Sequence, residues 1–182
     1  VYLDALGAQR IPDPTTAGDF CRRFDETTIE ALQTAINETR LRVWRAQPAE
    51  FFEEAIIDAD GTLAETTGQC KEGMDIAYNG VWGYHPLVVS LANTHEPLFL
   101  VNRSGNRPSA EGAAGRFDQA GALCRTAGFQ RLTFRGDTDF TQTRHLDRWD
   151  AAGVRFVFGC DARANLIREA DALPTRAWTR LV

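Results

Sequence analysis

The chain has 182 residues, of which 43% are hydrophobic and 25% charged, as in an ordinary soluble protein. This length allows one domain with a sizeable core and a small additional segment. No apolar run approaches the roughly 20 residues of a membrane-spanning helix, so the sequence predicts no membrane partner and a cytoplasmic location.

The net charge of −5 is divided unevenly along the chain. Residues 1–100 hold 7 basic and 16 acidic side chains, whereas residues 101–182 hold 13 basic and 9 acidic ones. The basic second half could bind a polyanion, or it could be ordinary solvated surface. Lys71 is the only lysine among the 20 basic residues, so nearly all positive charge lies on guanidinium groups, which suit phosphate.

The four cysteines, Cys21, Cys70, Cys124 and Cys160, are far apart and form no CxxC pair. The three histidines do not supply the close spacing of zinc ligands either. The pattern predicts reduced, mostly buried thiols and no structural zinc.

The first 50 residues are predicted to form a small helical segment. Residues 11–20, IPDPTTAGDF, indicate a proline-marked turn that leads into a helix with Thr15 or Thr16 as its N-cap. A longer helix is expected over residues 25–44 and a short helical piece over residues 49–55. These helices could contact DNA or could cap a core, and they show no firm sign of a helix-turn-helix.

Residues 51–182 are predicted to form an α/β domain. Its order is three strands, then helix, strand, helix, strand and helix. The strands are expected at residues 55–60, 84–93, 97–104, 131–137 and 154–161, and the helices at residues 109–128, 141–153 and 164–173. The first helix is expected to be capped by Ser109 and ended by Gly128.

Two pairs of aspartates follow apolar strands. Asp58 and Asp60 end the first strand and point to the same side, because side chains alternate along a strand. Asp137 and Asp139 repeat this arrangement after the fourth strand. Such residues also form turns, but two acidic strand ends in one chain favour a site for Mg²⁺ or Mn²⁺ and phosphate chemistry.

One site design with these motifs is that of haloacid dehalogenase-type phosphatases. DADGT resembles their nucleophile motif and GDTD their acidic metal motif, so that Asp58 would attack phosphorus and Asp60 would act as acid and base. That family usually places a lysine shortly before the second acidic motif, whereas Lys71 lies far too early. Its nucleophile strand also leads into a flap and helices rather than into a three-stranded meander.

The other design is the RNase H-like nuclease core. It has a three-stranded antiparallel meander followed by α-β-α-β-α, with one acid on the first strand and another just after the fourth. These two strands lie side by side in that fold. The order predicted above is the same, with Asp60 and Asp137 as the two acids.

Several segments resemble the catalytic core of bacterial insertion-sequence transposases of the Asp-Asp-Glu class. These segments are IDADGT, QCKEGMDIAYNGVWGYHPLVVSLANTHEPLFLVNRSGNRPS and LTFRGDTDF, and RIPDPTTAGDFCRRF is similar to the N-terminal region of the same proteins. The resemblance implies DNA transposition by metal-dependent cleavage and strand transfer at transposon ends. It also implies a nucleoid-associated, homodimeric enzyme in the bacterial cytoplasm.

By this resemblance Asp60 and Asp137 are the first two catalytic acids, and with a third they would hold two Mg²⁺ or Mn²⁺ ions. Asp58 and Asp139 would be neighbours that tune the electric field. The third acid of the family is a glutamate on a later helix. We expect it beyond Val182, so that residues 51–182 would lack the C-terminal part of the core; Glu169 is the alternative within the chain.

DNA over these carboxylates would need basic residues around it. Arg103, Arg107 and Arg135 are the candidates for phosphate contacts, although each could be an ordinary surface arginine. Trp82, Tyr84 and His85 could stack on distorted bases or pack in the core. A non-catalytic DNA-binding remnant is a further alternative function.

Overall fold

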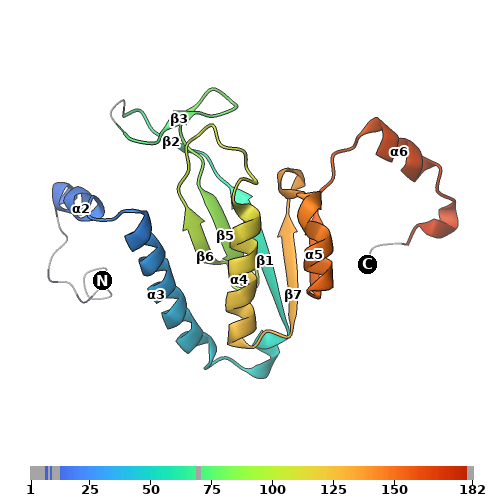
Figure 1. Ribbon diagram of the computed structural model, residues 1–182, viewed down its shortest axis with the longest axis horizontal. Coiled ribbons are helices and arrows are strands. Elements are labelled where there is room, and N and C mark those ends of the chain that lie inside the picture. The colour runs from blue at the N-terminus through green and yellow to red at the C-terminus, as the bar shows by residue number, and fades with distance from the viewer. Residues whose placement is uncertain (1–6, 8, 10–12, 69–70, 180–182) are drawn as a thin grey trace. The chain divides into compact units, whose positions relative to one another are not determined.

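The computed structural model describes residues 7, 9, 13–68 and 71–179, and it divides into two compact units, Val1–Gln47 and Pro48–Val182 (Figure 1). Cys70 and residues 11–12 of the expected N-terminal turn lie outside the described residues. None of the described helices is long and apolar enough to cross a membrane.

The first unit contains helices α2 (Pro14–Cys21) and α3 (Glu26–Trp44). The N-cap of α2 is Asp13, whose carboxylate accepts a hydrogen bond of 2.9 Å from the Thr15 amide. The expected cap at Thr15 or Thr16 is therefore wrong, because Pro14 fits the first helical position and moves the cap to the residue before it. Helix α3 begins with a capping box between Asp25 and Thr28.

The second unit is built on a five-stranded sheet with the order β6-β5-β1-β7-β8 (Figure 1). Its strands are β1 (Glu54–Gly61), β5 (Leu87–Leu91), β6 (Glu96–Val101), β7 (Arg131–Gly136) and β8 (Val154–Phe158). Strand β1 is antiparallel to β5, which is antiparallel to β6, while β1, β7 and β8 are parallel. This arrangement confirms the predicted RNase H-like α/β fold, in which a meander is extended by parallel strands.

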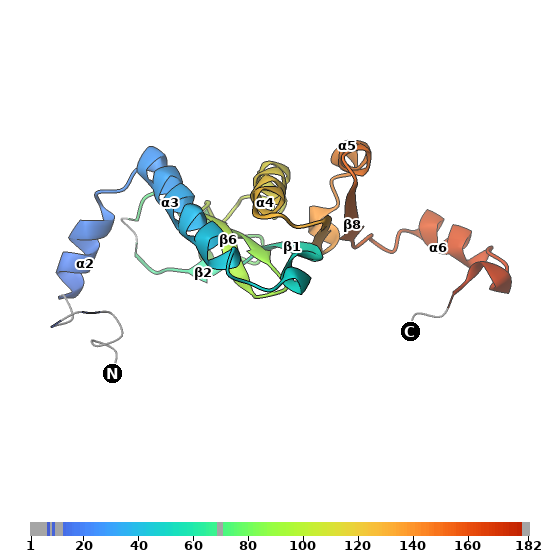
Figure 2. The same ribbon diagram turned by 90° about the horizontal axis from the view of Figure 1, so that it is seen from below.

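Helices α4 and α5 cover the same face of this sheet (Figure 2). The Phe134 ring of β7 lies 4.8 Å from that of Phe117 in α4 and 5.1 Å from that of Trp149 in α5, centroid to centroid. The helical elements of this unit are α4 (Ala113–Ala127), α5 (Leu146–Ala151), α6 (Ala164–Asp171) and the 3-10 turns η1 (Ala49–Phe52), η2 (Thr138–Phe140), η3 (Thr143–His145) and η4 (Thr175–Ala177).

Strand β1 separates apolar from polar side chains by simple alternation. Ala55, Ile57 and Ala59 are buried, whereas the acidic residues at the intervening positions are partly or fully exposed. On that polar face Glu54 accepts a hydrogen bond of 2.6 Å from the Thr133 hydroxyl of β7. The acids of β1 thus lie on the face opposite to α4 and α5.

A second, three-stranded sheet lies between β1 and β5 in the sequence and beyond the end of β1 in space (Figure 1). It consists of β2 (Ala64–Glu65), β3 (Asp75–Ile76) and β4 (Trp82–Tyr84), in the order β2-β4-β3. The sequence did not predict this sheet, because strands of two or three residues are too short to show a measurable alternation.

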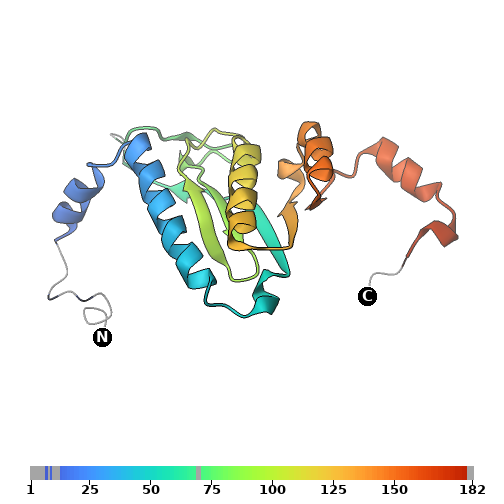
Figure 3. The same ribbon diagram turned by 60° about the horizontal axis from the view of Figure 1, so that its bottom comes forward.

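Two further expectations need correction. Helix α4, which lies along the β5–β6 hairpin in Figure 3, does not begin at Ser109 but after Gly112, although it ends at Gly128 as expected. The Ser109 hydroxyl instead donates a hydrogen bond to Asp139. Among the described cysteines, Cys124 is buried but Cys21 and Cys160 are exposed, so the expectation of mostly buried thiols is wrong.

Candidate active site

The ends of β1 and β7 carry the two predicted catalytic acids, and we refer to these ends as the carboxylate edge. The strands are adjacent and parallel, and their last paired residues are Asp58 and Arg135. Asp60 and Asp137 each lie two residues beyond this last pair, so both acids follow the same end of two adjacent strands. The backbone of Asp137 is still extended, with φ −75° and ψ −168°.

Asp58 is held by an arginine of the neighbouring strand. Arg135 donates from Nε to Oδ1 at 2.6 Å and from Nη2 to Oδ2 at 2.5 Å. The hydrogen bonds and the charge of Asp58 raise the pKa of the Arg135 guanidinium. Both oxygens of Asp58 are thus occupied and its charge is compensated, which leaves Asp60 as the uncompensated acid of β1.

Asp60 and Asp137 are exposed and make only local hydrogen bonds through their side chains. One oxygen of Asp60 accepts from the Gly61 amide at 2.8 Å, and one oxygen of Asp137 accepts from the Asp139 amide at 2.9 Å. No other described residue bonds to either carboxylate. Each acid therefore keeps one oxygen available, and exposed carboxylate oxygens are the donors that Mg²⁺ and Mn²⁺ prefer.

A third acidic ligand does not join this pair within the described part of the chain. No three Asp, Glu, His or Cys side chains of the described residues form a metal-binding group. Glu169 lies on α6, where every residue through Glu169 is exposed, and it does not complete such a group. The described residues thus provide a two-carboxylate arrangement.

Arg103 organises the loop of residues 104–112, which leads from β6 to α4. Its Nε donates to the His85 carbonyl at 2.9 Å, and its Nη1 donates to the carbonyls of Pro108, Ser109 and Glu111 at 3.2, 3.0 and 2.7 Å. Its Nη2 is buried without a hydrogen-bond partner among the described residues. Burial lowers the pKa of Arg103, and the nearby Glu111 carboxylate opposes this effect.

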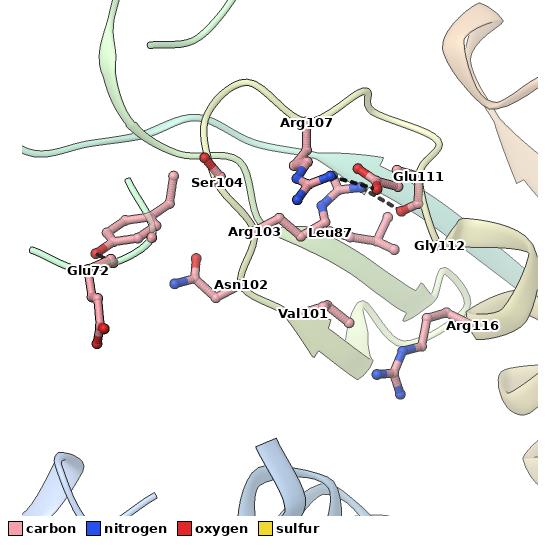
Figure 4. A pocket seen from close by; sticks show the side chains of 12 residues that line it. Glu72, Leu87, Val101, Asn102, Arg103, Ser104, Arg107, Glu111, Gly112 and Arg116 are labelled. Atoms are coloured by element: carbon pink, nitrogen blue, oxygen red, sulfur yellow. Dashed lines mark hydrogen bonds and ion pairs between the residues drawn. The ribbon is translucent and has the colours of Figure 1, made fainter. Parts of the chain in front are cut away.

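The same loop borders a cavity of about 540 Å³, in which Arg103 and Arg107 lie beside Glu111 (Figure 4). Arg107 forms an ion pair of 3.1 Å with Glu111 and keeps 55% of its side chain exposed. Of the three arginines expected to contact phosphate, Arg107 and Arg135 thus keep about half of their side chains exposed and each pairs with one acid, whereas Arg103 donates to carbonyls. The phosphate contacts themselves stay predictions.

The three aromatic side chains singled out in the sequence lie in different surroundings. Trp82 is half exposed, whereas the Tyr84 hydroxyl donates to the Glu72 carbonyl at 2.8 Å. His85 is 5% exposed, and its Nδ1 lies 2.9 Å from the Arg107 carbonyl. The most exposed aromatic of this region, Tyr78, was missed because an isolated tyrosine in a loop gives no periodic signal.

The chain matches a known protein family over most of its length. The family model described as "Transposase DDE domain group 1" matches residues 7–182. A search of curated proteins gives no match. The match covers both units and both acids of the carboxylate edge, and it favours neither the phosphatase nor the remnant alternative. It implies DNA as the partner and transposition as the function. The chain belongs to the DDE transposases, in the family of transposase DDE domain group 1.

Proposed function

We propose that this protein cleaves transposon-end DNA and transfers its strands with the help of divalent metal ions held by Asp60 and Asp137. The parallel direction of β1 and β7 supports this proposal, because Asp60 and Asp137 then follow the same end of two adjacent strands. A phosphatase that used Asp58 as its nucleophile would need that carboxylate free, whereas both its oxygens bond to Arg135.

The residues at the carboxylate edge fit Mg²⁺ or Mn²⁺. Asp60 and Asp137 would bind through the oxygens that do not accept from the amides of Gly61 and Asp139. When bound, such ions lower the pKa of an attacking water or DNA 3′-hydroxyl and stabilise the leaving oxygen. The proposal includes a third acidic ligand, a glutamate, which the described residues do not supply beside this pair.

The protein itself contributes position and charge. The extended strand ends fix the two carboxylates, and the Asp58–Arg135 pair keeps a third negative charge from repelling the DNA phosphate beside them. Arg107 supplies an exposed cation on the loop of residues 104–112. A homodimer and a nucleoid-associated location in the bacterial cytoplasm are further parts of the proposal.

Metal binding and DNA cleavage test the proposal together. Isothermal titration with Mn²⁺ is expected to show binding that Asp60→Asn and Asp137→Asn each weaken by at least about tenfold, since each removes a charged ligand. Asp147→Asn, an exposed acid in the first turn of α5, is the matched control. Cleavage is measured on DNA that carries the sequences flanking the coding region.

Two results would count against this function. One is Mn²⁺ affinity that does not change in Asp60→Asn and Asp137→Asn. The other is metal-dependent cleavage of the flanking DNA by either variant at the wild-type rate. Turnover of an aryl phosphate that Asp58→Asn abolishes would favour the phosphatase instead.

A further inference from the structure

His85 is a buried residue that lies against the end of strand β1. It is 5% exposed and stands between β4 and β5 in the sequence. A Cβ atom added to Gly61, the last residue of β1, would lie 2.5 Å from His85 Nε2 and 3.2 Å from Cδ2. Gly61 has no left-handed backbone conformation, so it is the space beside the ring that requires a glycine. The edge of the imidazole ring thus packs directly on the Gly61 backbone.

Gly61 in turn orients the Asp60 carboxylate. The Gly61 amide donates to one oxygen of Asp60 at 2.8 Å, which restricts the directions in which the other oxygen can point. The next amide, that of Thr62, donates to the Pro86 carbonyl at 3.1 Å. The chain directly after Asp60 is therefore held by His85 and Pro86, and a movement of His85 would move the amide that orients Asp60.

The other contacts of His85 are hydrogen bonds to the chain after β6. The His85 amide donates to the Arg103 carbonyl at 2.8 Å, and the His85 carbonyl accepts from Arg103 Nε at 2.9 Å. Nδ1 lies 2.9 Å from the Arg107 carbonyl and must carry the ring proton, because a carbonyl oxygen only accepts. These three hydrogen bonds fix both the backbone and the ring of His85, so the ring cannot turn away from Gly61 without losing one of them.

We propose that His85 is a positioning residue, which holds the Asp60 carboxylate in a fixed place relative to residues 103–107. It acts through Gly61 and not by contact with the reacting atoms. Groups that support a metal ligand from behind keep it in the orientation that the ion requires, and their loss weakens metal binding although the ligand itself is intact. This role rests on the proposed function, because only there does Asp60 hold a metal ion.

The test changes the contact between His85 and Gly61 from both sides. His85→Asn keeps an N–H group for the Arg107 carbonyl but lacks Nε2 and Cε1, so a gap replaces the ring edge beside Gly61. Gly61→Ala adds the Cβ atom that meets the ring. In the double variant this Cβ occupies the gap, so the two substitutions should compensate each other. His95→Asn, the same change at an exposed turn, is the matched control.

Two measurements report on the Asp60 carboxylate. Isothermal titration with Mn²⁺ is expected to give an affinity roughly tenfold weaker in each single variant and within about threefold of wild type in the double variant. In the metal-free protein, NMR spectra should show shifted Gly61 and Thr62 amide signals in His85→Asn, while the amide signals of α4 stay in place. A general loss of stability would lower the fraction of folded protein and leave the Mn²⁺ affinity of that fraction unchanged.

The proposal is overturned if both folded single variants bind Mn²⁺ like wild type, or if the double variant binds it no better than Gly61→Ala. Where a single variant does not fold, the double variant decides: near-wild-type affinity supports the positioning role, and weak binding or failure to fold rejects it. A wild-type protein that binds no Mn²⁺ would instead contradict the proposed function. The NMR signals of Gly61 and Thr62 would still show whether His85 fixes the strand end, so the two failures give different results.

Discussion

Arg135 of β7 and Asp58 of β1 form a two-point ion pair, two residues before Asp137 and Asp60 respectively. The pair joins the parallel strands at the last registered position before the carboxylate edge. It also distinguishes two acids that look alike in the sequence, because Asp58 is neutralised by its partner and Asp60 is not. The side chains of Arg135 and Asp58 remain 51% and 28% exposed, so solvent screens their attraction.

This pair is expected to contribute modestly to stability. In a double-mutant cycle with Asp58→Asn and Arg135→Gln, the coupling free energy of unfolding should be about 0.5 to 1 kcal/mol, at the upper end for partly exposed pairs because the geometry is bidentate. Urea denaturation measures it. The double-mutant cycle of Glu54 and Arg155, which make a single contact of 3.5 Å, serves as the control and should give a smaller coupling free energy. Strict additivity of Asp58→Asn and Arg135→Gln would contradict the prediction.

The glycine after Asp60 is required by the packing of His85. A Cβ at Gly61 would lie 2.5 Å from Nε2 of a ring that is buried and held by the Arg107 carbonyl. Gly61→Ala should therefore lower the free energy of unfolding by about 1 to 3 kcal/mol and reduce DNA cleavage, because the strand end that holds Asp60 must shift.

Gly115→Ala is the matched control for this substitution. Gly115 lies in helix α4, where an added Cβ meets nothing within 4 Å. The substitution should raise the free energy of unfolding by about 0.5 to 1 kcal/mol, since alanine loses less backbone entropy in a helix. Thermal unfolding of both variants checks the contrast, and a neutral Gly61→Ala would show that the ring moves freely.

The order of the main strands and the placement of Asp60 and Asp137 at strand ends were readable from the sequence, because long apolar runs and turn residues are local signals. The start of α4 could not be predicted from the sequence. Ser109 is a good N-cap by type, but its hydroxyl bonds to Asp139, which is 30 residues away. The loop before α4 is also fixed by Arg103, so the helix starts only after Gly112.

The roles of the arginines could not be predicted from the sequence for the same reason. In the sequence Arg103, Arg107 and Arg135 were equivalent cations near acidic motifs. In the fold Arg103 donates to carbonyls, Arg135 pairs with Asp58 across parallel strands, and Arg107 pairs with a glutamate four residues away in its own loop. These differences depend on which groups distant parts of the chain bring together, and residue type carries no information about that.

His145 is expected to make stability depend on pH. Burial lowers its pKa from 6.5, as do the charges of Arg148 and Arg144, while Asp118 opposes them. The folded state therefore binds a proton less readily than the unfolded state. The free energy of unfolding should fall as the pH decreases through 6.5 toward the lower folded-state pKa.

Urea denaturation at pH 7.5 and 5.5, values about one unit on either side of the unfolded pKa, measures this effect. The His145→Gln variant should show a smaller difference between the two conditions. His95→Asn is the control at an exposed turn with φ 59°, a conformation that asparagine tolerates, and it should retain the wild-type difference. A pH dependence that is the same in His145→Gln and wild type would assign the effect to other groups.

Arg103 is predicted to be the most costly of the loop residues to replace. Arg103→Met keeps the apolar stem but removes donors from four carbonyls, which should lower the free energy of unfolding by about 2 to 4 kcal/mol. Arg125→Met is the control, since Arg125 donates to one carbonyl, that of Gln130 at 3.2 Å, and its replacement should cost less than about 1 kcal/mol.

Hydrogen exchange of the residue 104–112 amides, compared with that of the α4 amides, shows which part of the chain Arg103→Met destabilises. Faster exchange confined to the loop is expected, because Arg103 ties the loop to the His85 carbonyl, which lies between β4 and β5. Exchange unchanged in the loop, or a cost no larger than that of Arg125→Met, would mean that His85, Ser109 and Gln142 hold the loop without Arg103.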